Sequence, residues 1–150
     1  MAHIVFTMIK TFRGTLADDT FETLRLATND GLTGYRIKKF RLIPTEPGGL
    51  SAEHIVQVYS VTPASNTNVI NFDNPLVIAA GYCSNATSGD NYPTEDTIII
   101  DAVTVNQDIF VSHKIRNGTG SVNYYLELEQ IKLDLNEATV ATLKDMRGRE

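Results

Sequence analysis

The chain has 150 residues, of which 42% are hydrophobic and 21% charged, so we expect one ordinary domain spanning residues 1–150. Its formal net charge is −5 and it has no basic block, which argues against nucleic acid or an anionic membrane as a partner. The start of the sequence lacks a basic region and a cleavage site, and the single Cys83 has no intrachain partner, so we expect synthesis in a cytoplasm.

The first half of the sequence predicts a series of short strands separated by turn residues. Strands are expected at residues 3–12, 21–28, 34–43 and 55–61, then a brief one at 69–72 and another at 76–82. The first strand is apolar on both sides, with Ile4, Phe6 and Met8 on one face. Such a strand is typical of an element that a neighbouring subunit covers.

Turn and spacing signals locate the joints between these strands. Asn29-Asp30-Gly31 predicts a hairpin between residues 21–28 and 34–43. A change of parity across Lys38-Lys39 predicts a β-bulge. The small residues Ala79 to Gly81 allow another layer to approach closely, and the polar stretches 44–50 and 83–96 are expected to face outward.

The most strongly patterned stretch is Thr97 to Leu133, which predicts three consecutive strands joined by two tight turns. A polar turn is expected at 106–108, and a tight hairpin loop at 117–120, where Asn and Gly supply positive φ. From Val122 to Leu128 apolar and polar residues alternate strictly, so one face should be buried and one wet. The pattern slips at Gln130, which predicts a bulge or a strand passing between two sheets.

The C-terminal segment is helical in its pattern, and we expect a helix at about residues 136–147. Asn136 is the predicted N-cap, and Leu135 and Val140 stand where a hydrophobic staple would place them. Val140, Leu143 and Met146 form a narrow apolar stripe. Because so short a helix is marginal alone, it should dock on its own sheet or on a neighbour.

Together these elements predict an all-β fold: an antiparallel β-sandwich of jelly-roll type with eight or nine strands and a short C-terminal α-helix. A closed barrel is the alternative closure of the same strands. The absence of Trp and of paired Cys disfavours an immunoglobulin-type sandwich.

Candidate site residues are few and scattered. The three histidines, His3, His54 and His113, fall on separate strands and are expected to be hydrogen-bonded strand residues rather than metal ligands. The loop carboxylates Asp90, Glu95 and Asp96 could bind Ca²⁺, but their spacing is not that of an EF-hand and solvated carboxylates are the simpler interpretation.

Other polar residues favour structural roles. Asp101 lies within an apolar run and is expected to be buried in a salt bridge, and Cys83 to be a buried, inert thiol. The basic strand residues Arg36, Lys38, Lys39 and Arg41 are expected to be solvated or salt-bridged. We therefore predict no catalytic residue, no cofactor and no metal ligand, and we do not expect an enzyme.

The segment from Asn106 to Gly148 resembles small, mostly uncharacterised proteins of marine bacteriophages. The resemblance rests on QDIFVSH, VNYYLELEQIKL and NEATVATLKDMR and covers about the last third of the chain. It implies a phage-encoded protein, and for a small all-β phage protein it implies a virion component.

On this resemblance we expect a capsid protein (shell, minor or decoration) that acts through contacts with its own copies and with other virion proteins. The predicted interface residues lie in the N-terminal strand and the C-terminal helix: Ile4, Phe6, Met8, Leu135, Val140, Leu143 and Met146. The alternative is a carbohydrate- or receptor-binding jelly roll of a phage tail or fibre, using the 83–96 loop with Tyr82 or Tyr92.

Overall fold

The computed structural model of the protein describes residues 8–47, 52–85 and 96–148, without the side chains of residues 85 and 144–148. Within these ranges the chain forms eight strands and one helix, so the predicted strand count and C-terminal helix are confirmed. The elements in chain order are β1 (Met8–Leu16), β2 (Thr20–Leu24), β3 (Thr33–Pro44), β4 (Ala52–Tyr59), β5 (Val77–Asn85), β6 (Asp96–Ile100), β7 (Ile109–Gly118), β8 (Val122–Lys132) and α1 (Leu135–Gly148).

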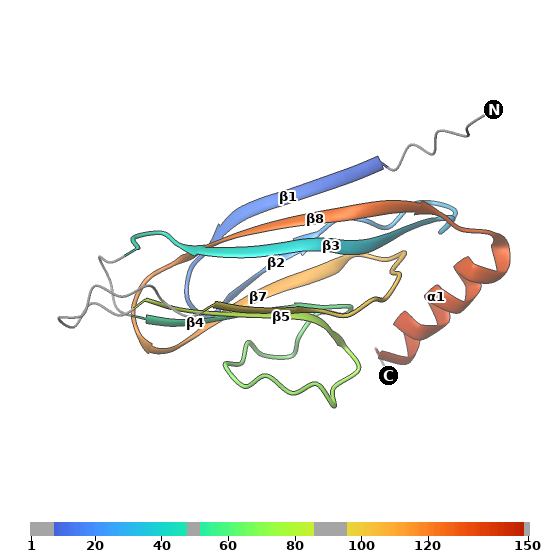
Figure 1. Cartoon of the computed structure of the whole chain (residues 1–150). Helices are drawn as coiled ribbons and strands as arrows, with labels where there is room; N and C mark the ends of the chain where they lie inside the picture. Colours follow the sequence, from blue (N-terminus) through green and yellow to red (C-terminus); the bar gives the residue numbers. More distant parts are fainter. Residues whose placement is uncertain (1–7, 48–51, 86–95, 149–150) are drawn as a thin grey trace.

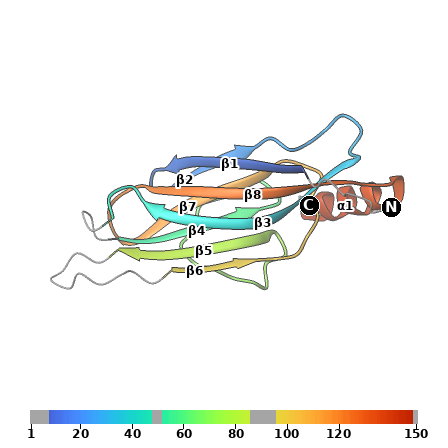
Figure 2. The ribbon, with the colours of Figure 1, turned by 45° about the horizontal axis from the view of Figure 1, so that its top comes forward.

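The strands form two antiparallel sheets packed face to face, which confirms the predicted all-β sandwich. One sheet has the order β1-β8-β3 and the other the order β2-β7-β4-β5-β6. Figure 1 shows the two layers, with α1 beyond one end of the strands, and Figure 2 shows the order of the strands across them.

The chain changes sheets at four connections in the described residues: β1 to β2, β2 to β3, β3 to β4 and β7 to β8. The predicted hairpins at 29–31 and 117–120 are therefore wrong, because each of these turns links strands of different sheets. Asn117 and Gly118 do adopt the positive φ expected of them, 57° and 109°. Positive φ allows a tight reversal but does not determine whether the next strand pairs with the previous one.

Strand β8 is the central strand of the smaller sheet and follows its predicted alternation. Val122, Tyr124, Leu126 and Leu128 are at most 2% exposed. The predicted irregularity at Gln130 is absent, since β8 pairs with both neighbours through this residue without a register shift there. Leu133 is buried because it follows the end of the strand, where the chain turns toward α1.

The predicted bulge at Lys38-Lys39 is confirmed by a register shift between Ile37 and Lys39 where β3 pairs with β8. The shift leaves two successive lysines exposed instead of sending one inward. Lys38 pairs with Glu129 at 3.0 Å and Lys39 with Glu127 at 3.8 Å. This part of the basic face is thus salt-bridged, one of the two predicted outcomes.

The region around β6 differs most from the prediction. β6 pairs with β5 and not with β7, and residues 101–108 are not a continuation of the strand. Val105 instead forms an isolated bridge with Tyr35 of β3, so the chain passes from the edge of one sheet to the edge of the other. Asp101 is exposed in this crossing, and its predicted burial is wrong.

Strands β4 and β7 are buried on both faces because the connection 60–76 crosses the outer face of their sheet. The predicted strand at 69–72 is wrong: these residues lie in that covering connection. The Gln57 amide Nε2 donates to the carbonyls of Thr67 and Val69, at 3.3 and 3.2 Å. These two bonds attach the connection to β4. A small apolar cluster of Tyr59, Val77 and Phe110 lies under the same cover.

The two sheets approach closely where β5 carries small residues, as predicted. A Cβ atom at Gly81 would lie 2.8 Å from Ile98 Cδ1 and 2.8 Å from Leu42 Cδ1, closer than Cβ contacts in proteins. Leu42 belongs to β3 of the opposite sheet, so the missing side chain makes room for a core residue of the other layer.

We predict that Gly81→Val destabilises the fold by about 1–3 kcal/mol, the usual cost of overpacking a core. Urea denaturation measures this change. Leu42→Ala alone should cost about 2–5 kcal/mol. The double variant should lose less than the sum of the two single losses, because the truncated Leu42 vacates the space that the introduced valine needs. Simple additivity would contradict the contact.

Candidate functional site

The N-terminus of α1 is capped two residues earlier than predicted. The Asp134 carboxylate Oδ1 accepts the backbone N–H of Glu137 at 2.7 Å, and this hydrogen bond holds the pKa of Asp134 below its ordinary value. Asp134 is therefore the N-cap and Asn136 is not. The staple positions move with the cap to Leu133 and Ala138, which are each 5% exposed.

In the described structure, the buried side chain of Asn106 ties α1 to the sandwich by hydrogen bonds. Asn106 is 1% exposed, and its amide Nδ2 lies 2.9 Å from Thr142 Oγ1 and 3.3 Å from the carbonyl of Ala138. The same nitrogen donates to the carbonyl of Gly31 at 3.1 Å. The helix thus presents Ala138 and Thr142 to its own sandwich.

The described part of the predicted apolar stripe of α1 faces solvent. Val140 and Leu143 of the stripe are 53% and 48% exposed, and Leu135, which was predicted at the staple, is 74% exposed. The helix turns Ala138 and Thr142 toward Asn106, so the face that carries Val140 and Leu143 points away from the sandwich. The helix was predicted to dock on its own sheet or on a neighbour. The described residues of its own sheet do not cover this stripe.

A second exposed apolar group lies at the start of β1. Met8 and Ile9 are 65% and 49% exposed. β1 is hydrogen-bonded to β8 on one side and forms an edge of its sheet, so its other side has free backbone groups in the described structure. Because Met8 pairs with Gln130, close to where β8 leads into α1, both groups lie at the same end of the molecule (Figures 1 and 2).

We call these two exposed groups together the apolar end and define it by Met8, Ile9, Leu135, Val140 and Leu143. Four of the predicted interface residues belong to it and are exposed, as a contact surface requires. The other three, Ile4, Phe6 and the side chain of Met146, lie outside the described residues. A role in subunit contacts remains a prediction.

Two of the histidines meet in the core, which the sequence analysis missed by treating them as scattered. His54 of β4 and His113 of β7 are 1% and 0% exposed, and their rings stack with centroids 5.1 Å apart. His54 Nδ1 lies 2.9 Å from His113 Nε2. The signal was available in part, because each histidine has the same strand parity as inward-facing valines.

The hydrogen bonds of the pair define its protonation. His113 Nδ1 lies 3.1 Å from the carbonyls of both Leu16 and Ala17, so this nitrogen carries a proton and donates it. His113 Nε2 then accepts from His54 Nδ1. Burial lowers the pKa of His54 to about 4, with His113 as a second cause, and burial also lowers the pKa of His113. Both rings are therefore neutral at pH 7.

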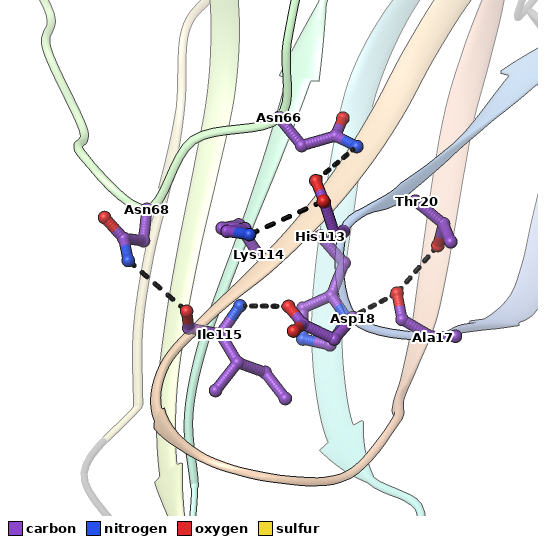
Figure 3. A network of polar contacts seen from close by, with 9 residues as sticks. Ala17, Asp18, Thr20, Asn66, Asn68, His113, Lys114 and Ile115 are labelled. Carbon is purple, nitrogen blue, oxygen red and sulfur yellow. Dashed lines mark hydrogen bonds and ion pairs between the residues drawn. The ribbon is translucent and has the colours of Figure 1, made fainter.

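The turn beside this pair is held by carboxylates (Figure 3). Asp18 Oδ1 accepts the backbone N–H of Ile115 at 2.8 Å. Asp19 pairs with Lys114 at 3.5 Å and accepts the amide of Asn66 at 3.2 Å. The network joins the β1–β2 turn and the connection 60–76 to β7, and so it has a structural role.

Among the described residues, the remaining candidates do not converge on a catalytic or metal site. No group of three or more His, Cys, Asp or Glu side chains in the described ranges is placed to hold a metal ion. Asp96 is exposed, while Asp90 and Glu95 lie outside the described residues, as does His3. Cys83 is buried as predicted, and burial raises the pKa of its thiol to about 11.

Comparisons with known proteins do not assign the chain to a family. No family model matches the sequence, and no curated protein matches it. In the described part of the chain, no helix has the length and apolar character needed to cross a bilayer. The resemblance to phage proteins stays a prediction.

We predict that the histidine pair makes folding stability fall between pH 7 and pH 5. The unfolded chain takes up a proton at His54 below about pH 6.5, whereas the folded chain stays neutral until about pH 4. Stability should therefore decline by up to about 1.4 kcal/mol per pH unit for this residue. Chemical denaturation at several pH values measures it.

His54→Gln is the matching control, because it removes one titrating ring and should flatten this dependence. Asp30 and Asp134 do not contribute to the change between pH 7 and pH 5, because their pKa values lie below the ordinary value of 3.8 in the folded chain. An unchanged slope in the variant would assign the pH dependence to other groups.

Proposed function

We propose that this protein is a structural component of a bacteriophage virion, in the capsid as a shell, minor or decoration protein. It works through contacts with its own copies and with other virion proteins. The observation that carries the proposal is the apolar end, because an amphipathic helix and an edge strand expose large apolar side chains at the same end of the molecule (Figure 1).

The energetics of the helix support a docking role. α1 has 14 residues, and isolated helices of this length are marginal in water. Burial of a Leu or Val side chain contributes about 1.5–3 kcal/mol relative to exposure, so covering the stripe would stabilise both the helix and the contact. Exposed apolar patches on a folded domain commonly mark interaction surfaces.

The strand order supports a jelly-roll assignment. In both sheets, strands from the end of the chain lie between strands from its beginning: β8 lies between β1 and β3, and β7 lies between β2 and β4. Two interleaved Greek keys produce this order. A four-plus-four jelly roll would place β6 beside β3. Here β6 pairs with β5, while Val105, just after it, bridges to Tyr35 of β3. We propose a jelly roll with this one displaced strand.

A structural role also agrees with where the titratable groups lie. The histidine pair is buried, and each of its three hydrogen-bonded ring nitrogens faces a protein group. A substrate has no route to a ring that is 0% exposed. We propose the virion as the place of action, after synthesis in the host cytoplasm.

We predict that the purified chain forms oligomers and that Val140→Asp with Leu143→Asp converts them to monomers. Two carboxylates at a buried contact carry a desolvation cost that exposed positions do not incur. Light scattering coupled to size exclusion measures the mass. The variant monomer should keep the circular-dichroism spectrum of the wild type, because surface substitutions usually change the stability of a single molecule by within about 0.5 kcal/mol. Its midpoint of thermal unfolding should nevertheless fall, because the stabilisation that the subunit contact supplies is lost.

The matched control is Val69→Asp with Phe72→Asp, which makes the same change at residues 64% and 60% exposed on the connection 60–76. This control should keep the oligomer. A wild-type chain that is monomeric at every concentration, or a control that dissociates equally, would contradict assembly through the apolar end.

We further predict that the protein is present in purified particles of the phage that encodes it. Quantitative mass spectrometry should find it in many copies per particle, because shell and decoration proteins are repeated by symmetry. A few copies would instead indicate a tail part, and absence from particles would exclude the proposal.

A further inference from the structure

The outer face of the five-stranded sheet carries a large hollow beside the connection 60–76. Its volume is about 860 Å³, within the range of ligand pockets. The walls come from the ends of β2 and β4, the start of β7 and the crossing connection. This surface is separate from the apolar end, none of whose residues lines it.

The hollow is preformed because its covering connection is fixed at several points. Gln57 holds the carbonyls of Thr67 and Val69, as described above. The backbone N–H of Ser60 donates to the carbonyl of Leu76 at 2.9 Å, which closes the two ends of the connection. A ligand would therefore meet walls that need little ordering, which lowers the free-energy cost of binding.

Backbone hydrogen bonds fix the carboxylate of Asp108 in the wall of the hollow. Asp108 Oδ1 accepts the backbone N–H groups of Leu26 and Ala27, at 2.8 and 2.9 Å. Asp108 Oδ2 lies 3.8 Å from Arg25 Nη1, a loose ion pair whose arginine side chain is 86% exposed. One carboxylate oxygen is thus immobilised by the fold, while the other faces an exposed cation at the rim.

The chemistry of the lining selects a class of ligand. Arg25 and Asp108 are its only charged residues and have opposite signs, so the described lining has no net charge to attract an ion. The other polar groups are hydroxyls and amides, including those of Thr67, Asn74 and Gln107. The floor is apolar, with Phe110 and Tyr59 nearly buried beneath it.

We propose that this hollow binds a neutral saccharide. Vicinal hydroxyl groups would donate to Asp108 Oδ2 and accept from Arg25, and the less polar face of the sugar would lie on the apolar floor. A carboxylate and a guanidinium bound to adjacent hydroxyls form charge-assisted hydrogen bonds, which are stronger than neutral ones. The site differs from the 83–96 loop and Tyr82 or Tyr92 expected for a carbohydrate-binding module.

The test titrates the full chain with neutral trisaccharides of glucose, galactose and N-acetylglucosamine, followed by amide chemical shifts in NMR. At least one sugar should shift residues 23–25, 107–108 and 62–67. Arg25→Ala should weaken that affinity about tenfold or more, the loss of one charge-assisted hydrogen bond. Because Arg25 is exposed, this variant keeps its fold, which the same spectra verify.

Arg116→Ala is the matched control. Arg116 lines a second hollow of about 540 Å³ on the same sheet face, and its loss should leave the affinity unchanged. The proposal is overturned if no neutral sugar shifts the named residues, if only an acidic saccharide binds, or if Arg116→Ala weakens binding as much as Arg25→Ala. None of these results bears on oligomer formation, so this proposal and the assembly proposal fail separately.

Discussion

The structure depends on one constraint: β4 and β7 are apolar on the core side and also need cover on the outer side. The chain meets it by laying residues 60–76 across the sheet. Gln57, 1% exposed, supplies the bonds that hold this cover, and the cluster of Tyr59, Val77 and Phe110 supplies the contact beneath it. The cover does not span the whole sheet, and the hollows on that face are the parts it leaves open.

The sequence predicted the fold class because burial leaves a local signature. The alternation from Val122 to Leu128 and the parity change at Lys38 are properties of single strands, and both are present in the structure. Pairing is not local. The turns at 29–31 and 117–120 were expected to form hairpins, yet a turn residue determines only the backbone angle and not which sheet receives the next strand.

The same distinction between local pattern and long-range contact explains which parts of the candidate site were predicted and which were missed. The amphipathic character of the C-terminal helix was readable, but which of its faces lies on the sandwich depends on a tertiary contact, the bonds from Asn106 to Ala138 and Thr142. The histidine pair was missed because its two rings are 59 positions apart and meet only when β4 lies beside β7. The hollow was missed for a similar reason, since Arg25 and Asp108 belong to distant segments.

The attachment of α1 has a geometric consequence for any shell built from this chain. In the described structure, the polar link between the helix and the sandwich is the one amide of Asn106, which shares its two hydrogens among three acceptors. A small tilt of the helix would redistribute those bonds without breaking them all. In the proposed assembly, such a tilt would let identical copies meet at slightly different angles while each sandwich keeps its shape.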